Sequence, residues 1–499
     1  MKVHLMHRDA DFDPGAELPG HAETLAQDLG LRTLFDAMAA RTDERDDYLY
    51  KIAVGAVMHP LTDADAIVYR QRILADCLDH PDLVRGLYDL AVEAVTGERG
   101  FYFGLFRDSP DAVMNRSVRL LDFLAVRLRK LRATADEHAA GFASGGFTRF
   151  FAMIAEELDD AYLAEVDAHL EELKFRRGSL ISARLGPGNR GRDHVLRRQR
   201  RPRGLRDRLT LGERGTYGFT IADRDEAGIH ALSDLRARGI NDAANAVGQA
   251  TDHIVAFFAA LRAELAFYVG CLNLHDRLAA IGAPACLPEP VPSRRPVLTA
   301  RGLYDMCLAL HTGTPPVGND LRADGRVLVM ITGANSGGKS TLLRAIGLAQ
   351  ILTQAGMFAP AAELRTDLRD GVYTHFKREE DATMRSGKLD EELARMSAIA
   401  DDIPPAGLLL CNESFASTNE REGSELARQI VHAMTDAGVK TVYVTHLYDL
   451  AHGLHTEDRA DLLFLRAHRD PDGTRTYTLP EAEPLPTSHG ADAFRRLFT

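Results

Sequence analysis

VLVMIT at residues 327–332, running directly into GANSGGKST at 333–341, decides the fold of the C-terminal part of this 499-residue chain. The apolar run is followed by a glycine-rich loop of the form G-x-x-x-x-G-K-[ST], and TLLRAIGLAQIL then continues at helical spacing. In a strand–loop–helix of this kind, glycines let successive backbone N–H groups point at phosphate oxygens, and the helix N-terminus adds the positive end of its dipole. The stretch therefore predicts a P-loop that binds ATP.

The side chains of this loop have separate expected tasks. Lys339 is expected to reach the β- and γ-phosphates, and the hydroxyl of Ser340 is expected to bind Mg²⁺. Asn335 is also a candidate catalytic residue. The candidate phosphate-binding residues are Gly333, Asn335, Ser336, Gly337, Gly338, Lys339, Ser340 and Thr341.

Two apolar strands downstream end in polar residues that suit ATP hydrolysis. GLLLCNE at 407–413 ends in Asn412 and Glu413, where P-loop ATPases carry an acidic pair for magnesium and water activation. Asn412 can still accept a hydrogen bond from a Mg²⁺-bound water, and Glu413 is placed to act as a general base. KTVYVTH at 440–446 ends in His446, which would face the ligand crevice of such a sheet. The alternatives are an N-capping role for Glu413 and a structural imidazole for His446.

The rest of the chain has a different pattern. Apolar residues at helical spacing between 113 and 131 and between 254 and 272 indicate long helices, which suit either a lever or plain core packing. Short strand-like pieces such as TYGFTIA at 216–222 lie between them, and the Pro-rich stretch 283–296 is predicted to be a linker. Alternating strands and helices after it indicate a mostly parallel sheet, so the fold class is α + α/β. The predicted domains are a mainly helical region, 1–290, with an insertion at about 184–225, and a nucleotide-binding domain, 291–499.

Arginines are concentrated in residues 184–208, which hold ten of them against the two acids Asp193 and Asp207. Guanidinium groups pair bidentately with phosphate, so this segment is a candidate contact for the DNA backbone. No aromatic residue interleaves the arginines, which argues against base stacking. A flexible, solvated loop is the alternative. The candidate DNA-backbone residues are Arg190, Arg192, Arg197, Arg198, Arg200, Arg201 and Arg203.

The composition is that of a globular protein, with 45% apolar and 26% charged residues. A formal net charge of −12 confines any DNA contact to a local surface. The N-terminus has no apolar core of signal-peptide length, and the apolar runs are shorter than a membrane span. Five scattered cysteines form neither a C-x-x-C pair nor an even disulfide framework. We therefore expect a cytoplasmic protein with reduced thiols and no membrane partner.

Taken together, these motifs resemble the MutS family of DNA mismatch-repair ATPases. The loop from Gly337 to Thr341 and the Ser417-Thr418 pair that follows Glu413 look like that family's motifs. Upstream, HPLTDADAIVYRQRIL at 59–74 resembles the start of the family's helical core. Further similar segments are VGND at 317–320, GMFAPA at 356–361, VTHLYDL at 444–450, TSHG at 487–490, SGGFTRFF at 144–151 and the helix at 251–278.

The resemblance implies a helical core and lever followed by an ABC-type ATPase domain. It also implies ATP and Mg²⁺ as cofactors, DNA and downstream repair proteins as partners, and a homodimer with ATP sites between two subunits. In such sites a serine of one subunit contacts the γ-phosphate held by the other, and the candidate here is Ser386 with Gly387. A plain helix cap is the alternative. Core-like sequence begins near the N-terminus, so the chain resembles a shortened member without the mismatch-recognition and connector domains.

The expected function is therefore that of a slow DNA-dependent ATPase, which couples ATP binding and hydrolysis to recognition or clamping of DNA in mismatch repair or recombination. One alternative is a P-loop ATPase that remodels a protein or RNA partner. Another is a nucleotide-dependent DNA clamp that barely turns over, which the missing charge at Asn412 favours. DNA binding that falls with salt would exclude the first alternative, and a turnover measurement would decide the second.

Overall fold

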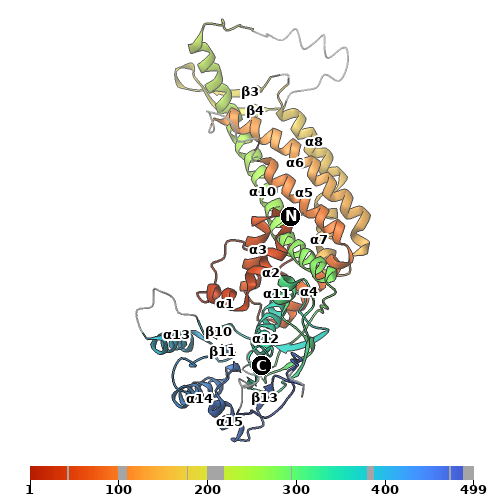
Figure 1. The fold of residues 1–499 in the computed structure, drawn as a ribbon. Coiled ribbons are helices and arrows are strands. Elements are labelled where there is room, and N and C mark those ends of the chain that lie inside the picture. Colours follow the sequence, from red (N-terminus) through yellow and green to blue (C-terminus); the bar gives the residue numbers. More distant parts are fainter. Residues whose placement is uncertain are drawn as a thin grey trace. The chain divides into compact units, whose positions relative to one another are not determined.

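The structure, a computed structural model, describes residues 1–41, 44–98, 100, 109–176, 178–198, 218–293, 295–378, 387–470 and 474–486. The chain forms two compact units, each made of separated segments (Figure 1). Unit 1 comprises Met1–Val3, Arg85–Phe142 and Phe147–Arg262, and unit 2 comprises His4–Val84, Ala143–Gly146 and Ala263–Thr499. The division into functional domains at residue 290 stays a prediction, because these units are defined by compactness alone.

The described part of unit 1 is built from long helices and a β-hairpin. Three of its helices, α6, α8 and α10, share a small core, to which α6 contributes Met114 and Val118, α8 Leu170, and α10 Ile240 and Ala244. Both predicted long helices are confirmed, since the two apolar stripes lie in α6 and α10. The described part of TYGFTIA, residues 218–222, is neither helix nor strand, so the predicted strand is wrong at these residues. The elements are α5 (Pro81–Glu98), α6 (Pro110–His138), α7 (Gly145–Glu157), α8 (Asp160–Leu173), β3 (Leu180–Leu185), β4 (Gly191–Arg197) and α10 (Glu226–Ala280), of which α5, α7 and α10 have residues in both units.

A five-stranded sheet in the order β10-β11-β12-β8-β13 forms the centre of unit 2, and all its neighbouring strands are parallel. The predicted parallel α/β sheet is thus confirmed. Its strands are continuous apolar runs because both faces are covered. Leu409 and Cys411 of β11 join the core formed with α14 and α15, whereas Leu410 points to the other face. There Leu410 meets Gly347 of α12, where an added Cβ would lie 2.6 Å from the Leu410 side chain.

A second sheet in unit 2 has the order β5-β9-β6-β7. Strand β5 comes from the Pro-rich stretch, and its residues 289–291 pair in parallel with β9. The predicted linker is therefore wrong at these residues. The reason is that β5 is an edge strand, where the missing N–H of Pro290 does not break a ladder of hydrogen bonds.

Unit 2 takes its helices and strands from both the N-terminal and the C-terminal parts of the chain. The helices are α1 (Ala22–Leu29), α2 (Leu31–Met38), α3 (Asp47–Met58), α4 (Ala64–Asp79), α11 (Met306–Thr312), α12 (Lys339–Gln354), α13 (Lys388–Asp402), α14 (Glu420–Asp436) and α15 (Tyr448–His455). The strands are β1 (Ala40–Arg41), β2 (Glu44–Arg45), β5 (Glu289–Val291), β6 (Leu298–Leu303), β7 (Asn319–Arg322), β8 (Leu328–Thr332), β9 (Glu363–Asp367), β10 (Val372–Phe376), β11 (Leu408–Asn412), β12 (Lys440–Val444) and β13 (Leu462–Arg466).

Helix α10 has 55 residues and includes a window that is long and apolar enough to cross a membrane. In that window, 67% of the residues are buried inside the protein. Core helices of soluble proteins pass the same test of length and composition, so this window is weak support for a membrane span.

Candidate nucleotide-binding site

The glycine-rich loop joins the buried strand β8 to helix α12, as the sequence predicts. Gly333 opens the loop with φ of 110°, and a Cβ there would lie 2.9 Å from the backbone nitrogen of Ala467. Ser336 also has a positive φ, 58°, although it is not a glycine. Left-handed conformations are costly for residues with a side chain and recur at ligand sites, where surrounding structure holds them in place. The loop is thus held tightly curled against the segment after β13.

Lys339 is the first residue of α12, and its side chain folds back over the loop. Its Nζ donates hydrogen bonds to the carbonyl oxygens of Gly333 (2.8 Å) and Ala334 (3.1 Å) and to Oδ1 of Asn335 (3.4 Å). Burial lowers the pKa of Lys339, and the nearby carboxylate of Glu413 opposes this effect. The ammonium group is therefore centred on the loop, where bound phosphates would meet it.

Ser340 and Asn412 come from different elements and meet directly. The Ser340 hydroxyl at the start of α12 donates to Oδ1 of Asn412 at the end of β11, at 2.8 Å. Mg²⁺ prefers oxygen ligands and retains several waters in nucleotide sites. The two side-chain oxygens therefore fit a magnesium ion held by Ser340 and, through water, by Asn412. A bound ion would neutralise part of the phosphate charge at this point.

Glu413 follows Asn412 in a left-handed conformation, with φ of 55°. Its backbone N–H donates to the carbonyl of Val444 (2.9 Å), which ties it to the end of β12. From the same end of β12, Nδ1 of His446 lies 3.8 Å from Oε1 of Glu413. His446 holds the pKa of Glu413 below its usual range, Lys339 and Lys377 add to this effect, and burial opposes it. The carboxylate is thus ionised at neutral pH and can accept a proton or orient a water molecule.

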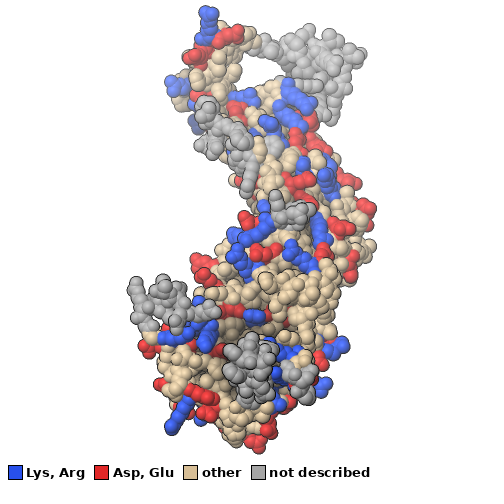
Figure 2. All heavy atoms as spheres, viewed as in Figure 1, with Lys and Arg blue, Asp and Glu red and all other residues tan. Residues whose placement is uncertain are grey.

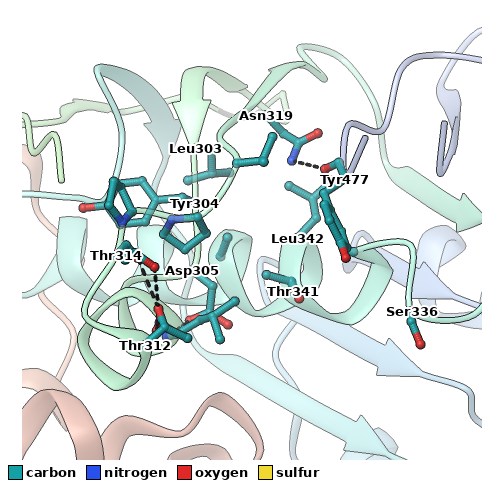
Figure 3. A pocket seen from close by; sticks show the side chains of 16 residues that line it. Leu303, Tyr304, Asp305, Thr312, Thr314, Asn319, Ser336, Thr341, Leu342 and Tyr477 are labelled. Atoms are coloured by element: carbon teal, nitrogen blue, oxygen red, sulfur yellow. Dashed lines mark hydrogen bonds between the residues drawn. The ribbon is translucent and has the colours of Figure 1, made fainter. Parts of the chain in front are cut away.

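A cavity of about 590 Å³ adjoins the loop on the side of α11 and β7 (Figure 3). Ser336, Gly338 and Thr341 line it at the loop, and Tyr304 and Tyr477 contribute aromatic side chains. Of this lining, sequence reasoning identified the loop residues Ser336, Gly338 and Thr341 and, through the resemblance, the VGND segment. Tyr304 and Tyr477 come from segments that are far apart in the sequence, and no sequence motif identifies either of them.

Asn319 of the VGND segment fixes the far wall of this cavity. Its Nδ2 donates to the carbonyl of Tyr477 (3.2 Å), and its Oδ1 accepts from the N–H of Leu479 (2.8 Å). Figure 3 shows the first of these bonds beside the Tyr477 ring. The Asn319 amide thereby connects the segment that follows β13 to strand β7, which gives the cavity a defined shape beside the phosphate loop.

Two other predicted groups are only partly described. Gly387 is the N-cap of α13, which agrees with a helix start at this motif, whereas Ser386 lies outside the described residues. TSHG at 487–490 also lies outside them. The in-trans contact to a γ-phosphate therefore stays a prediction.

The described candidate DNA-backbone arginines belong to unit 1, on the β3–β4 hairpin. Arg197 Nε donates to Ser182 Oγ (2.8 Å), and Arg198 pairs with Glu172 at 2.7 Å. Arg192 lies 3.5 Å from Asp193, and Arg190 is exposed in the turn. For the described residues on the visible face, Figure 2 shows basic and acidic side chains interspersed rather than one continuous basic field. Arg200, Arg201 and Arg203 lie outside the described residues.

Comparison with known proteins gives matches over most of the chain. Residues 62–281 match the family model of the MutS2 N-terminal domain, and residues 329–492 match that of MutS domain V. The chain is 24% identical over 488 residues to the DNA mismatch repair protein MutS of Shouchella clausii, which covers 86% of this chain and 54% of that protein. It is 28% identical over 249 residues to Endonuclease MutS2 of the same organism (48% of this chain, 32% of that protein). With the MutS protein of Chlorobium phaeobacteroides it shares 30% identity over 255 residues (49% and 27%).

The chain thus spans about half, or less, of the length of these curated relatives. The two matched regions between them include the bundle helices of unit 1 and the parallel sheet of unit 2.

Proposed function

Because this chain belongs to the MutS family, we propose that it is a DNA-binding ATPase that couples ATP binding and hydrolysis to recognition or clamping of DNA in mismatch repair or recombination. The relatives' names support the DNA-repair setting, since they are mismatch repair proteins and an endonuclease.

One observation carries the ATPase proposal. Ser340 Oγ lies 2.8 Å from Asn412 Oδ1, at the point where the loop with Lys339 meets the end of β11. Glu413, the next residue, carries an ionised carboxylate beside His446. Phosphate binding, a magnesium site and a water-activating group therefore converge at the carboxyl ends of neighbouring parallel strands, which is where such sheets bind ligands. The adjoining cavity with Tyr304 and Tyr477 would accept the nucleoside end of ATP.

We further propose a cytoplasmic homodimer with two shared ATP sites, each completed by the start of α13 from the other subunit. A helix N-terminus from a second subunit would supply positive dipole charge to the γ-phosphate. Asn412 favours slow turnover, since an amide brings no negative charge to the metal.

The first prediction tests ATP hydrolysis and its coupling to DNA. The parent protein should hydrolyse ATP slowly with Mg²⁺, and duplex or branched DNA should change the rate. Lys339→Ala should lose hydrolysis because a fixed positive charge on the phosphates is gone, and Lys51→Ala, which removes an exposed lysine of α3 away from the loop, is the control and should hydrolyse ATP as the parent does. Steady-state phosphate release measures both effects. A rate that is insensitive to every DNA tested would favour a protein or RNA remodeller, and hydrolysis by Lys339→Ala at the parental rate would exclude this site.

A further inference from the structure

The turn that carries Glu413 is strained and must be held from outside. Glu413 and Phe415 both have positive φ, 55° and 61°. Neither is a glycine, so the conformation persists only where neighbouring groups determine it. The side chain of Phe415 is fully buried, which leaves the turn little freedom to relax. What holds this turn therefore sets the direction of the Glu413 carboxylate.

Three of its anchors come from the neighbouring strands β12 and β10. The N–H of Glu413 donates to Val444 O at 2.9 Å, and the hydroxyl of Tyr443 donates to Ser414 O at 2.8 Å. The hydroxyl of Ser414 lies 2.8 Å from the carbonyl oxygen of His375. These bonds fix the turn to the sheet itself.

The Ser414 hydroxyl has two possible acceptors, and both belong to His375. His375 is buried, and burial lowers its pKa to about 4, so it is neutral at physiological pH. Its Nε2 lies 3.0 Å from the carbonyl oxygen of Glu392, which can only accept, so Nε2 carries the single ring proton. The Ser414 hydroxyl then has one proton for two acceptors, His375 Nδ1 at 2.6 Å and His375 O at 2.8 Å. Whichever of the two accepts the proton, Ser414 is held to His375 of β10.

The fourth anchor comes from a helix rather than from the sheet. The N–H of Phe415 donates to Oε2 of Glu392 at 2.8 Å. Glu392 is 2% exposed and lies in the second turn of α13, the helix that begins after Gly387. Since its backbone carbonyl also accepts from His375, Glu392 contacts both the turn and strand β10. Among the described hydrogen bonds, the one from Phe415 N–H to Glu392 joins a side chain of α13 to the backbone of the Glu413 turn.

We propose that Glu392 is a positioning residue: its carboxylate holds the Phe415 N–H and thereby makes the aim of Glu413 depend on the placement of α13. This inference rests on the proposed ATPase function, in which α13 also presents its N-terminus to the shared site. If α13 shifts, the Glu392 carboxylate that accepts the Phe415 N–H shifts with it. The turn can keep this hydrogen bond only if Glu413 moves as well. ATP binding at the loop is not affected, because Glu392 has no contact with Lys339 or Ser340 among the described bonds.

The test compares Glu392→Met, which fills the space without a carboxylate acceptor, with Glu392→Gln, which keeps an acceptor oxygen. Glu392→Met should lower kcat at least tenfold while the Kd for ATP stays within twofold of the parent. Glu392→Gln should recover most of the rate. Asp401→Ala, an exposed carboxylate in the last turn of the same helix, is the matched control and should behave as the parent. If Glu392→Met does not fold, Glu392→Asp, which draws the acceptor back by one methylene, takes its place with the same expectation.

A double variant separates positioning from general stability. If Glu392 acts through Glu413, adding Glu392→Met to Glu413→Ala should lower the residual rate no further. An unchanged kcat in Glu392→Met, or an equal further loss in the double variant, would overturn the role of Glu392 and leave the ATPase proposal standing. A parent protein without Lys339-dependent hydrolysis would overturn the proposed function, and the role of Glu392 in hydrolysis with it.

Discussion

The carboxylate of Glu264 lies buried on α10 and accepts the backbone N–H groups of Leu5 and Met6, the latter at 2.8 Å. Burial raises its pKa to about 7, although these hydrogen bonds favour the ionised form. The folded protein therefore holds a proton that the unfolded chain has already released above its ordinary pKa of 4.5. By linkage, this group lowers stability as pH rises from about 4.5 to about 7, and its effect is constant on either side of that window.

The resulting prediction concerns the free energy of unfolding. The difference between a pKa of about 7 and one of 4.5 corresponds to about 3 kcal/mol for the parent across this window. Glu264→Gln cannot ionise, so its stability relative to the parent should improve as pH rises from 5 to 8. Urea unfolding at several pH values measures this, with Glu23→Gln, an exposed glutamate of α1, as the control. A difference between parent and Glu264→Gln that is the same at every pH would contradict the assignment.

At the scale of elements, the β3–β4 hairpin yields a prediction about DNA. Each arginine that neutralises one phosphate contributes about −0.9 to the slope of log affinity against log salt. Replacing both Arg190 and Arg192 with Ala should therefore make the slope shallower by up to about 2. Arg129→Ala, which removes a charge paired with Asp167 on α6 and α8, should leave it unchanged. DNA-binding titrations at several salt concentrations measure the slopes. Identical slopes for the parent and the double variant would favour the alternative that the hairpin is a solvated loop.

The elements that the sequence predicted well are those with strong local signals. Strands β8, β11 and β12 are buried apolar runs next to turns, and each is where the pattern placed it. The residues brought together at their ends, Lys339, Ser340, Asn412 and Glu413, were predicted for the same reason. Strand β5 was missed because its Pro290 is tolerated only at a sheet edge, and edge position is a tertiary property. The contact of Glu392 with Phe415 was missed because it depends on how α13 docks.

At the scale of the whole molecule, separated segments meet in ways that no linear boundary describes. Residues 4–12 belong to unit 2 because buried groups hold them there. Arg70 on α4 donates to Met6 O at 3.2 Å and to Ala355 O, at the end of α12, at 2.9 Å. A division of the sequence at residue 290 separates these partners, although they lie in one compact unit. Such contacts between distant segments leave no periodic pattern, so composition shifts could not reveal them.

The most direct test of the account is the fate of ATP bound to Glu413→Ala in the presence of Mg²⁺. This variant keeps Lys339 and Ser340, so it should bind ATP as the parent does. Without the water-activating carboxylate, turnover should fall by about 100-fold or more. The nucleotide extracted from the protein should therefore be intact ATP, about one per chain, and light scattering should show a dimer, whereas Lys339→Ala should retain little nucleotide. Extraction of ADP, with phosphate released at the parental rate, would contradict the central claim that Glu413 activates water in this site.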